Sequence, residues 1–142
     1  MRPERILETV LYADDLAATE AFYADALGLE VSSRQEGRHV FFRLGTQMLL
    51  IFNPHATAVP HPPNARLPVP PHGARGPGHV CFAATAAEID LWRAHLLASG
   101  IAIEADFEWP TADGTPGGRS IDFRDPAGNS VEFAEPKIWG LA

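Results

Sequence analysis

Short runs of alternating apolar and polar residues are separated along this chain by stretches in which apolar residues recur every three or four positions. Alternation is typical of a strand with one buried face, and the longer period is typical of an amphipathic helix. Residues 6–12 predict a strand, and a helix is expected from Asp14 or Asp15 to about Leu27, before Gly28. Three further strands are predicted at residues 29–34, 39–44 and 47–52.

The second half of the chain shows the same order of elements. Residues 78–83 predict a strand, and Thr85 with Glu88 has the spacing of a capping box, which predicts a helix that ends at Gly100. Three strands are then expected at residues 101–107, 120–123 and 129–134. A repeat of this kind indicates two similar modules.

We therefore expect an α+β fold in which the 142 residues form a single domain of two βαβββ modules. The first module spans residues 6–54 and the second spans residues 78–135. Eight of the 13 prolines lie in residues 53–77, so residues 55–77 are expected to form a linker. This linker is either a plain connector or a lid over a site, and a second loop is expected at residues 109–118.

The charge and the single cysteine exclude several classes of protein. A net charge of −7 argues against a nucleic-acid partner, because phosphate binding requires clustered Lys and Arg. No apolar run approaches the roughly 20 residues that cross a membrane, and no signal peptide is expected. Cys81 stands alone, which excludes an intrachain disulfide and a cysteine-based zinc site. We expect a cytoplasmic protein.

Candidate chemistry comes from polar residues that interrupt apolar strands. After the turn sequence at residues 125–128, Glu132 lies off the strand face that carries Val131 and Phe133. A carboxylate there requires a wet face or a binding site, because burial without partners is costly. His79 and Glu8 likewise lie off the apolar faces of the two strands that open the modules. All three side chains are expected to project away from the helices.

Four motifs in this order resemble the vicinal oxygen chelate superfamily, which includes glyoxalase I, bleomycin-resistance proteins, fosfomycin-modifying enzymes and extradiol dioxygenases. They are ETVLYADDL at residues 8–16, AFYADALGL at residues 21–29, GHVCF at residues 78–82 and DPAGNSVEF at residues 125–133. The resemblance covers residues 6–135. It implies two modules whose curved mixed sheets enclose a cleft, and a homodimer.

In metal-binding members of that superfamily, ligands come from the first and last strands of each module. The resemblance places those four positions at Glu8, Leu49, His79 and Glu132. His79 and Glu132 match the superfamily pattern. Glu8 stands where His or Gln is usual, and Leu49 stands where glyoxalase I has a glutamate. The implied ligands of a divalent ion are therefore Glu8, His79 and Glu132, with the identity of the ion open among Mn²⁺, Zn²⁺, Ni²⁺, Fe²⁺ and Mg²⁺.

This ligand set favours a metal-dependent enzyme that acts on a small oxygenated molecule. Two carboxylates and one imidazole differ from the two-His-one-carboxylate set of non-haem iron oxygenases, so lyase, isomerase or thiol-transferase chemistry is favoured over ring cleavage. Glu132 or Glu8 would be the catalytic base. The alternative is a metal-free protein that binds and sequesters a drug or metabolite, as bleomycin-resistance proteins do. A lone His or Glu on a strand is also often simply solvated.

Further polar and apolar residues are expected near the same site. Those predicted to contact substrate are Tyr12, Leu49, Cys81, Ser120 and Asp122. Cys81 is not expected to be a nucleophile, because nothing nearby in sequence would lower the pKa of its thiol. Arg119 and Arg124 are either anion-binding groups or surface charges. His55, His61 and His72 of the linker form the only rival candidate for a metal site.

Overall fold

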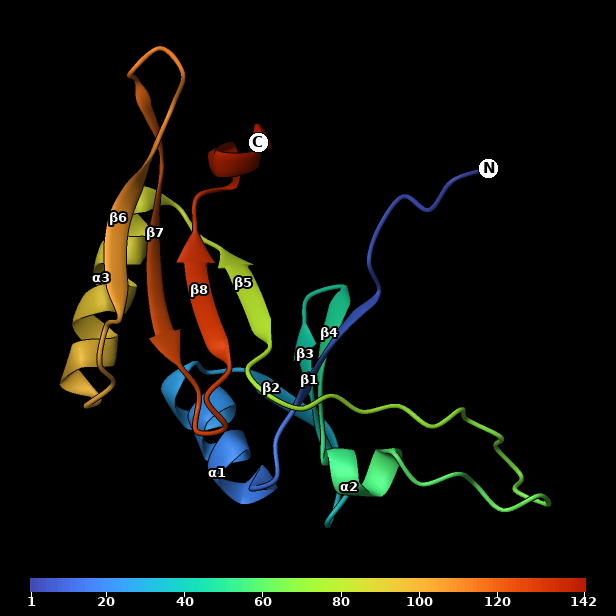
Figure 1. Cartoon of the computed structure of the whole chain (residues 1–142). Coiled ribbons are helices and arrows are strands. Elements are labelled where there is room, and N and C mark those ends of the chain that lie inside the picture. Colours follow the sequence, from blue (N-terminus) through green and yellow to red (C-terminus); the bar gives the residue numbers. More distant parts are fainter. The chain divides into compact units, whose positions relative to one another are not determined.

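The computed structural model describes residues 1–142 and separates into two compact units, Met1–Gly78 and His79–Ala142 (Figure 1). Each unit contains a four-stranded mixed sheet. The α+β class and the two βαβββ modules predicted from the sequence are confirmed. The linker belongs to the first unit.

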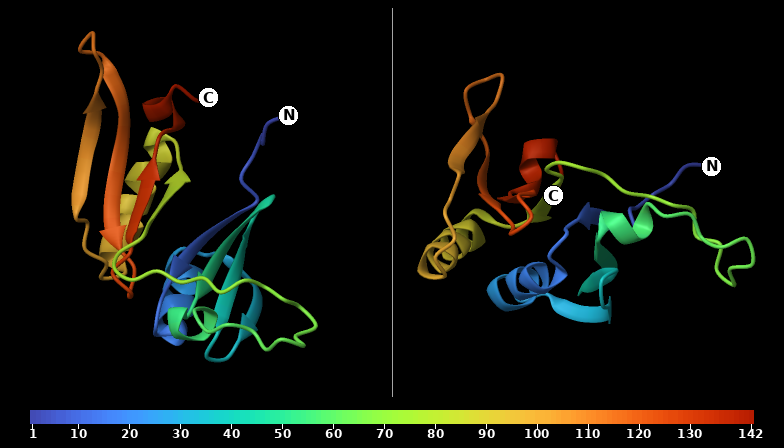
Figure 2. Two further views of the ribbon diagram at one scale, coloured as in Figure 1. Left: turned by 45° about the vertical axis from the view of Figure 1, so that its right-hand side comes forward. Right: turned by 60° about the horizontal axis from the view of Figure 1, so that its bottom comes forward.

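The first unit has the strand order β1-β4-β3-β2. Its strands are β1 (Glu8–Tyr12), β2 (Glu30–Gln35), β3 (His39–Leu44) and β4 (Gln47–Phe52). β1 pairs in parallel with β4, and the remaining pairs are antiparallel. The helical segment at residues 16–26 lies against the sheet of this unit (Figure 2). Tyr23 of this segment is buried, and its ring lies 5.5 Å from that of Phe42 on β3.

The second unit repeats this topology with the order β5-β8-β7-β6. Its strands are β5 (His79–Ala83), β6 (Ala105–Pro110), β7 (Pro116–Arg124) and β8 (Ser130–Ala134). The helix α3 (Ala86–Ala98) lies against one face of the sheet (Figure 1). Phe133 is the centre of an aromatic core on that face, because its ring stacks on Trp92 at 4.5 Å and also neighbours Phe123 and Phe82.

The predicted helix starts agree with the observed caps. Asp15 caps α1 (Leu16–Glu20) by accepting a hydrogen bond from the backbone N–H of Ala18, and Thr85 with Glu88 forms the predicted capping box of α3. The first helix is not continuous, however. A π-helical segment, η1 (Ala21–Ala26), follows α1, and the chain leaves it through Gly28 at φ 71°.

Two loops carry more structure than expected. The proline-rich linker opens with a short helix, α2 (Pro54–Thr57), and the predicted loop at residues 109–118 contributes its ends to β6 and β7. A 3-10 turn, η2 (Pro136–Trp139), follows β8. No helix in the structure has both the length and the apolar content that crossing a membrane requires.

Candidate functional site

Strand alternation divides the second sheet into two faces. Ile121, Phe123 and Val131 are fully buried on the face that packs on α3. The opposite face, which we call the far face, carries His79 and Cys81 of β5, Glu132 of β8, Ser120 and Asp122 of β7, and Phe107 and Trp109 of β6. The polar side chains singled out in this module therefore gather on one surface.

His79 and Glu132 lie together on the far face, as the sequence predicted. His79 Nε2 is 3.3 Å from Glu132 Oε2. The imidazole is about half exposed, whereas Glu132 is only 8% exposed. Two ligand atoms at about 2.1 Å from one ion lie roughly 3.0–3.4 Å apart at octahedral or tetrahedral angles. The spacing of the two atoms is therefore compatible with two positions of a metal coordination sphere.

Cys81 and Asp122 flank Glu132 directly, because both are its register partners on the neighbouring strands. Burial, followed by the Glu132 charge, raises the pKa of Asp122. Burial also raises the pKa of the Cys81 thiol to about 12, with further contributions from the charge of Glu132 and a hydrogen bond to it. Cys81, Glu132 and Asp122 therefore form an environment that disfavours additional negative charge and favours a cation.

Ser120 lies on the predicted face, where its side chain contacts Trp109 and Glu132. It is fully buried, accepts a hydrogen bond from Trp109 Nε1 at 2.8 Å, and donates one to Glu132 Oε1 at 2.5 Å. Its hydroxyl is thus engaged with these two side chains in this structure, and the contact of Ser120 with substrate stays a prediction. Trp109 is 42% exposed and was placed in a loop by the sequence, so its contact with Ser120 was missed.

Glu8 and Tyr12 share the corresponding face of β1 in the first unit. Glu8 is exposed, while the Tyr12 hydroxyl is hydrogen-bonded to His72 Nδ1 at 2.7 Å, and burial raises the pKa of the Tyr12 phenol. No three His, Cys, Asp or Glu side chains gather closely enough in the structure to hold a metal ion. Because Glu8 belongs to the first unit and the His79–Glu132 pair to the second, the three-residue ligand set stays a prediction.

Leu49 does not occupy the position that the superfamily resemblance assigned to it. Leu49 pairs with Thr9 and Phe42 and is 2% exposed on the face that packs against the helix. Leu50 instead stands opposite Val10, as Glu132 stands opposite Cys81. Leu49 is therefore a core residue and not a substrate contact, and the absent fourth carboxylate corresponds to Leu50.

The rival histidines of the linker have separate partners. His55 Nε2 lies 3.4 Å from Asp14, His61 Nδ1 lies 2.8 Å from the carbonyl oxygen of Pro62, and His72 is bonded to Tyr12. They do not form a common metal site.

Arg119 and Arg124 are also paired with carboxylates. Arg119 bonds Asp106 and Asp90, and Arg124 bonds Glu104. These interactions favour the interpretation of both arginines as structural surface charges rather than as anion-binding groups.

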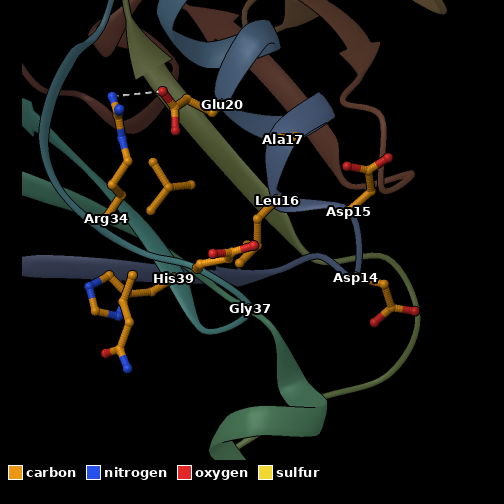
Figure 3. Close-up of a pocket in the computed structure, with 11 residues that line it drawn as sticks. Asp14, Asp15, Leu16, Ala17, Glu20, Arg34, Gly37 and His39 are labelled. Carbon is orange, nitrogen blue, oxygen red and sulfur yellow. Dashed lines mark ion pairs between the residues drawn. The ribbon is translucent and has the colours of Figure 1, made fainter.

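A cavity of about 660 Å³ in the first unit lies beside the start of α1 and the β2–β3 turn (Figure 3). Asp14, Asp15 and Glu20 contribute acidic groups, and Glu20 is ion-paired with Arg34 at 2.9 Å. His39 borders the cavity, and burial lowers the pKa of its imidazole. The acidic lining disfavours anionic ligands, and nothing in the sequence predicted this cavity.

The raised pKa of Cys81 predicts low thiol reactivity in the metal-free protein. At pH 8 a pKa of about 12 instead of 9.0 lowers the thiolate fraction about a thousandfold. The greater nucleophilicity of a more basic thiolate offsets part of this, so reaction with an aromatic disulfide reagent should be about 30- to 60-fold slower than in the unfolded chain. The rate of thiol release, measured between pH 7 and 10, checks this.

Glu132→Gln provides the matched control for this experiment. Removing the charge beside Cys81 removes one of the causes of its raised pKa, so the variant thiol should react faster than the wild-type thiol. Because burial is the largest cause of the raised pKa, the pH dependence of the rate is needed to separate the pKa of the thiol from its accessibility. Equal rates in the folded and unfolded wild-type chain would contradict the predicted pKa.

The comparisons with known proteins agree on one family. The sequence profile of the Glyoxalase/Bleomycin resistance protein/Dioxygenase superfamily matches residues 5–133. The chain is similar to the crystal structure of a lactoylglutathione lyase from Agrobacterium tumefaciens, with 46% identity, a TM-score of 0.90, and coverage of 99% of this chain and 100% of that one. No curated protein gives a significant match.

More distant structures share the fold. A virulence protein from Salmonella typhimurium is 28% identical, with a TM-score of 0.67 and coverage of 95% of this chain and 98% of that one. A glyoxalase/bleomycin resistance protein/dioxygenase from Nocardioides is 24% identical, with a TM-score of 0.70 and coverage of 95% and 85%. The two βαβββ modules, the profile match and these similarities show that the chain belongs to the glyoxalase/bleomycin resistance protein/dioxygenase superfamily, also called the vicinal oxygen chelate superfamily.

Proposed function

We propose that this protein is a divalent-metal-dependent lyase or isomerase that acts on a small oxygenated molecule. The observation that carries the proposal is the His79–Glu132 pair, whose facing atoms are 3.3 Å apart on the far face of the second sheet. Glu8 is the proposed third ligand. The similarity to a lactoylglutathione lyase supports metal dependence and this class of reaction.

The three residues suit a metal ion with open positions. An imidazole nitrogen and two carboxylates supply the donors that Mn²⁺, Zn²⁺, Ni²⁺ and Fe²⁺ accept. Leu50 and Val10, which stand opposite each other in the first sheet, add no further donor. When bound, the ion would polarise adjacent oxygen atoms of the substrate and stabilise negative charge that develops there.

We propose lactoylglutathione as the first substrate to test. Glu132, or Glu8, would take the proton from the carbon that carries the hydroxyl group and return it to the neighbouring thioester carbon, while the hydroxyl proton moves to the former thioester carbonyl oxygen. This proton transfer converts the 2-hydroxythioester into an isomeric hemithioacetal, in which all atoms are retained. Cleavage of the hemithioacetal then releases the free thiol and a 2-oxoaldehyde, so thiol release reports the reaction.

The decisive experiment uses protein without a histidine tag. The apoprotein is reconstituted separately with Mn²⁺, Zn²⁺, Ni²⁺, Fe²⁺ or Mg²⁺, and bound metal and turnover are then measured. We expect about one ion per chain, metal-dependent turnover, and loss of both in His79→Ala. His61→Ala, which changes an exposed linker histidine, is the matched control and should keep both. A wild-type protein that binds none of these ions would refute the proposal, and binding without turnover would reject this substrate.

The exposed aromatic pair on the far face favours a second candidate, the metal-free sequestration of an aromatic drug or metabolite. Phe107 and Trp109 are 39% and 42% exposed, and their rings meet at 62° with centroids 5.0 Å apart. Such a pair offers a planar ligand a stacking surface. If this candidate holds, bleomycin should quench tryptophan fluorescence in the chelator-treated protein, and Trp109→Phe should abolish the change. Unaltered fluorescence in the wild type would speak against it.

A further inference from the structure

The side chain of Glu132 is held by a chain of hydrogen bonds that the proposed ligand set does not include. Trp109 Nε1 donates to Ser120 Oγ at 2.8 Å, and Ser120 Oγ donates to Glu132 Oε1 at 2.5 Å. The chain connects three neighbouring strands, since Trp109 lies on β6, Ser120 on β7 and Glu132 on β8. All three side chains belong to the second unit.

The direction of these hydrogen bonds is fixed by chemistry. An indole N–H can only donate, so the oxygen of Ser120 must accept from Trp109. A serine hydroxyl has one proton, and the carboxylate oxygen is the acceptor that lies 2.5 Å away. Ser120 is fully buried and Glu132 is 8% exposed, so bulk water competes little with the bond between them.

The two oxygens of Glu132 are therefore not equivalent. Oε1 accepts the hydrogen bond of Ser120, whereas Oε2 faces the half-exposed imidazole of His79. Asp122 and Cys81 flank the same carboxylate on the neighbouring strands. A ligand that approaches from the His79 side meets Oε2 alone.

We propose that Ser120, oriented by the indole of Trp109, is a positioning residue that makes Glu132 present a single oxygen, Oε2, to the bound metal ion. The metal half of this inference rests on the proposed function. The hydrogen-bond chain itself does not, because it is formed by residues of the metal-free protein. Residues that orient metal ligands typically change metal affinity 10- to 100-fold when they are removed.

The first test uses metal-free protein and the NMR signals of the three tryptophan indole N–H groups, with Trp109 assigned by Trp109→Phe. In Ser120→Ala we expect the Trp109 indole signal to change its chemical shift and to lose its protection from exchange. In Ser120→Thr, which restores a hydroxyl, the wild-type chemical shift and protection should be retained. A signal that is unchanged in Ser120→Ala would overturn the hydrogen-bond chain. This outcome is independent of whether the protein binds metal.

The second test compares Mn²⁺ affinity and the visible absorption of the Co²⁺-loaded protein. Ser120→Ala should still bind about one ion, with affinity lowered about 10- to 100-fold and an altered Co²⁺ spectrum, because Oε1 becomes free to coordinate. Trp109→Phe should change the Mn²⁺ affinity and the Co²⁺ spectrum in the same direction as Ser120→Ala. Ser120→Thr should restore the wild-type affinity and spectrum. Unchanged affinity and spectrum in Ser120→Ala and Trp109→Phe would overturn the inference. A wild-type protein that binds neither ion would instead refute the proposed function, and the indole signals would still decide the position of Ser120.

Discussion

Glu132→Gln should leave the chain folded but lower its affinity for divalent metal by at least about 100-fold, more than the loss expected for a residue that only orients a ligand. Glutamine keeps the shape of glutamate, and its amide oxygen can still accept the hydrogen bond from Ser120. The variant loses the negative charge and presents a neutral amide to His79 instead of a carboxylate oxygen. Hard divalent cations bind carboxylate oxygens far better than neutral amides. Calorimetric titration with Mn²⁺ and Zn²⁺ measures the effect.

Glu135→Gln is the matched control for this substitution. Glu135 follows β8, where one of its oxygens accepts a hydrogen bond from the backbone N–H of Arg119 and the other pairs with Lys137. The Glu135→Gln substitution therefore removes one carboxylate near the same strand and leaves the His79–Glu132 pair unchanged. We expect Glu135→Gln to bind metal as the wild type does. Equal affinities in Glu132→Gln and the wild type would show that Glu132 is not a ligand.

The second module was predictable from sequence because its strands alternate clearly. Val131 and Phe133 mark one face of β8, so Glu132 could be assigned to the other face before any pairing was known. The same argument placed His79 off the face of Val80 and Phe82. Parallel pairing of β5 with β8 then brings the two polar side chains together.

The first module was less predictable because β4 is apolar on both faces. Met48, Leu49, Leu50 and Ile51 follow one another without a polar residue to set the phase. The register against β1 decides which residue corresponds to Glu132, and that register is a tertiary property. A one-residue error therefore moved the assignment from Leu50 to Leu49 and to the wrong face of the sheet.

The hydrogen bonds that hold Glu132 could not be found from sequence for a different reason. Proline and glycine are frequent in the residues that follow Trp109, and this composition is typical of a loop. In the structure β6 continues to Pro110, with a register shift between Glu108 and Pro110. This irregular strand end brings the indole of Trp109 to Ser120, a contact that alternation alone does not predict.

Phe133→Ala should destabilise the protein by about 3–5 kcal/mol, a large share of the stability of an ordinary domain. Phe133 is 5% exposed, and its ring stacks on Trp92 at an interplanar angle of 12°. Truncation leaves a cavity lined by aromatic rings anchored on separate elements, α3, β5 and β7, so the surroundings can close it only in part. Urea denaturation followed by tryptophan fluorescence measures the loss.

Phe107→Ala separates the effect of burial from the loss of a phenyl ring as such. Phe107 lies in the same unit but on the far face of the sheet, where it is 39% exposed, so its truncation should cost less than about 1 kcal/mol. Phe133→Leu, which refills most of the cavity, should fall between the two alanine variants. If Phe133→Ala and Phe107→Ala had the same urea midpoint, the aromatic cluster under α3 would not be the stabilising core of this unit.

Because Glu132 lies next to Phe133 on β8, a weakened core would also loosen the strand that holds the proposed ligand. Metal affinity in Phe133→Ala should therefore fall as well, whereas Phe107→Ala should retain it.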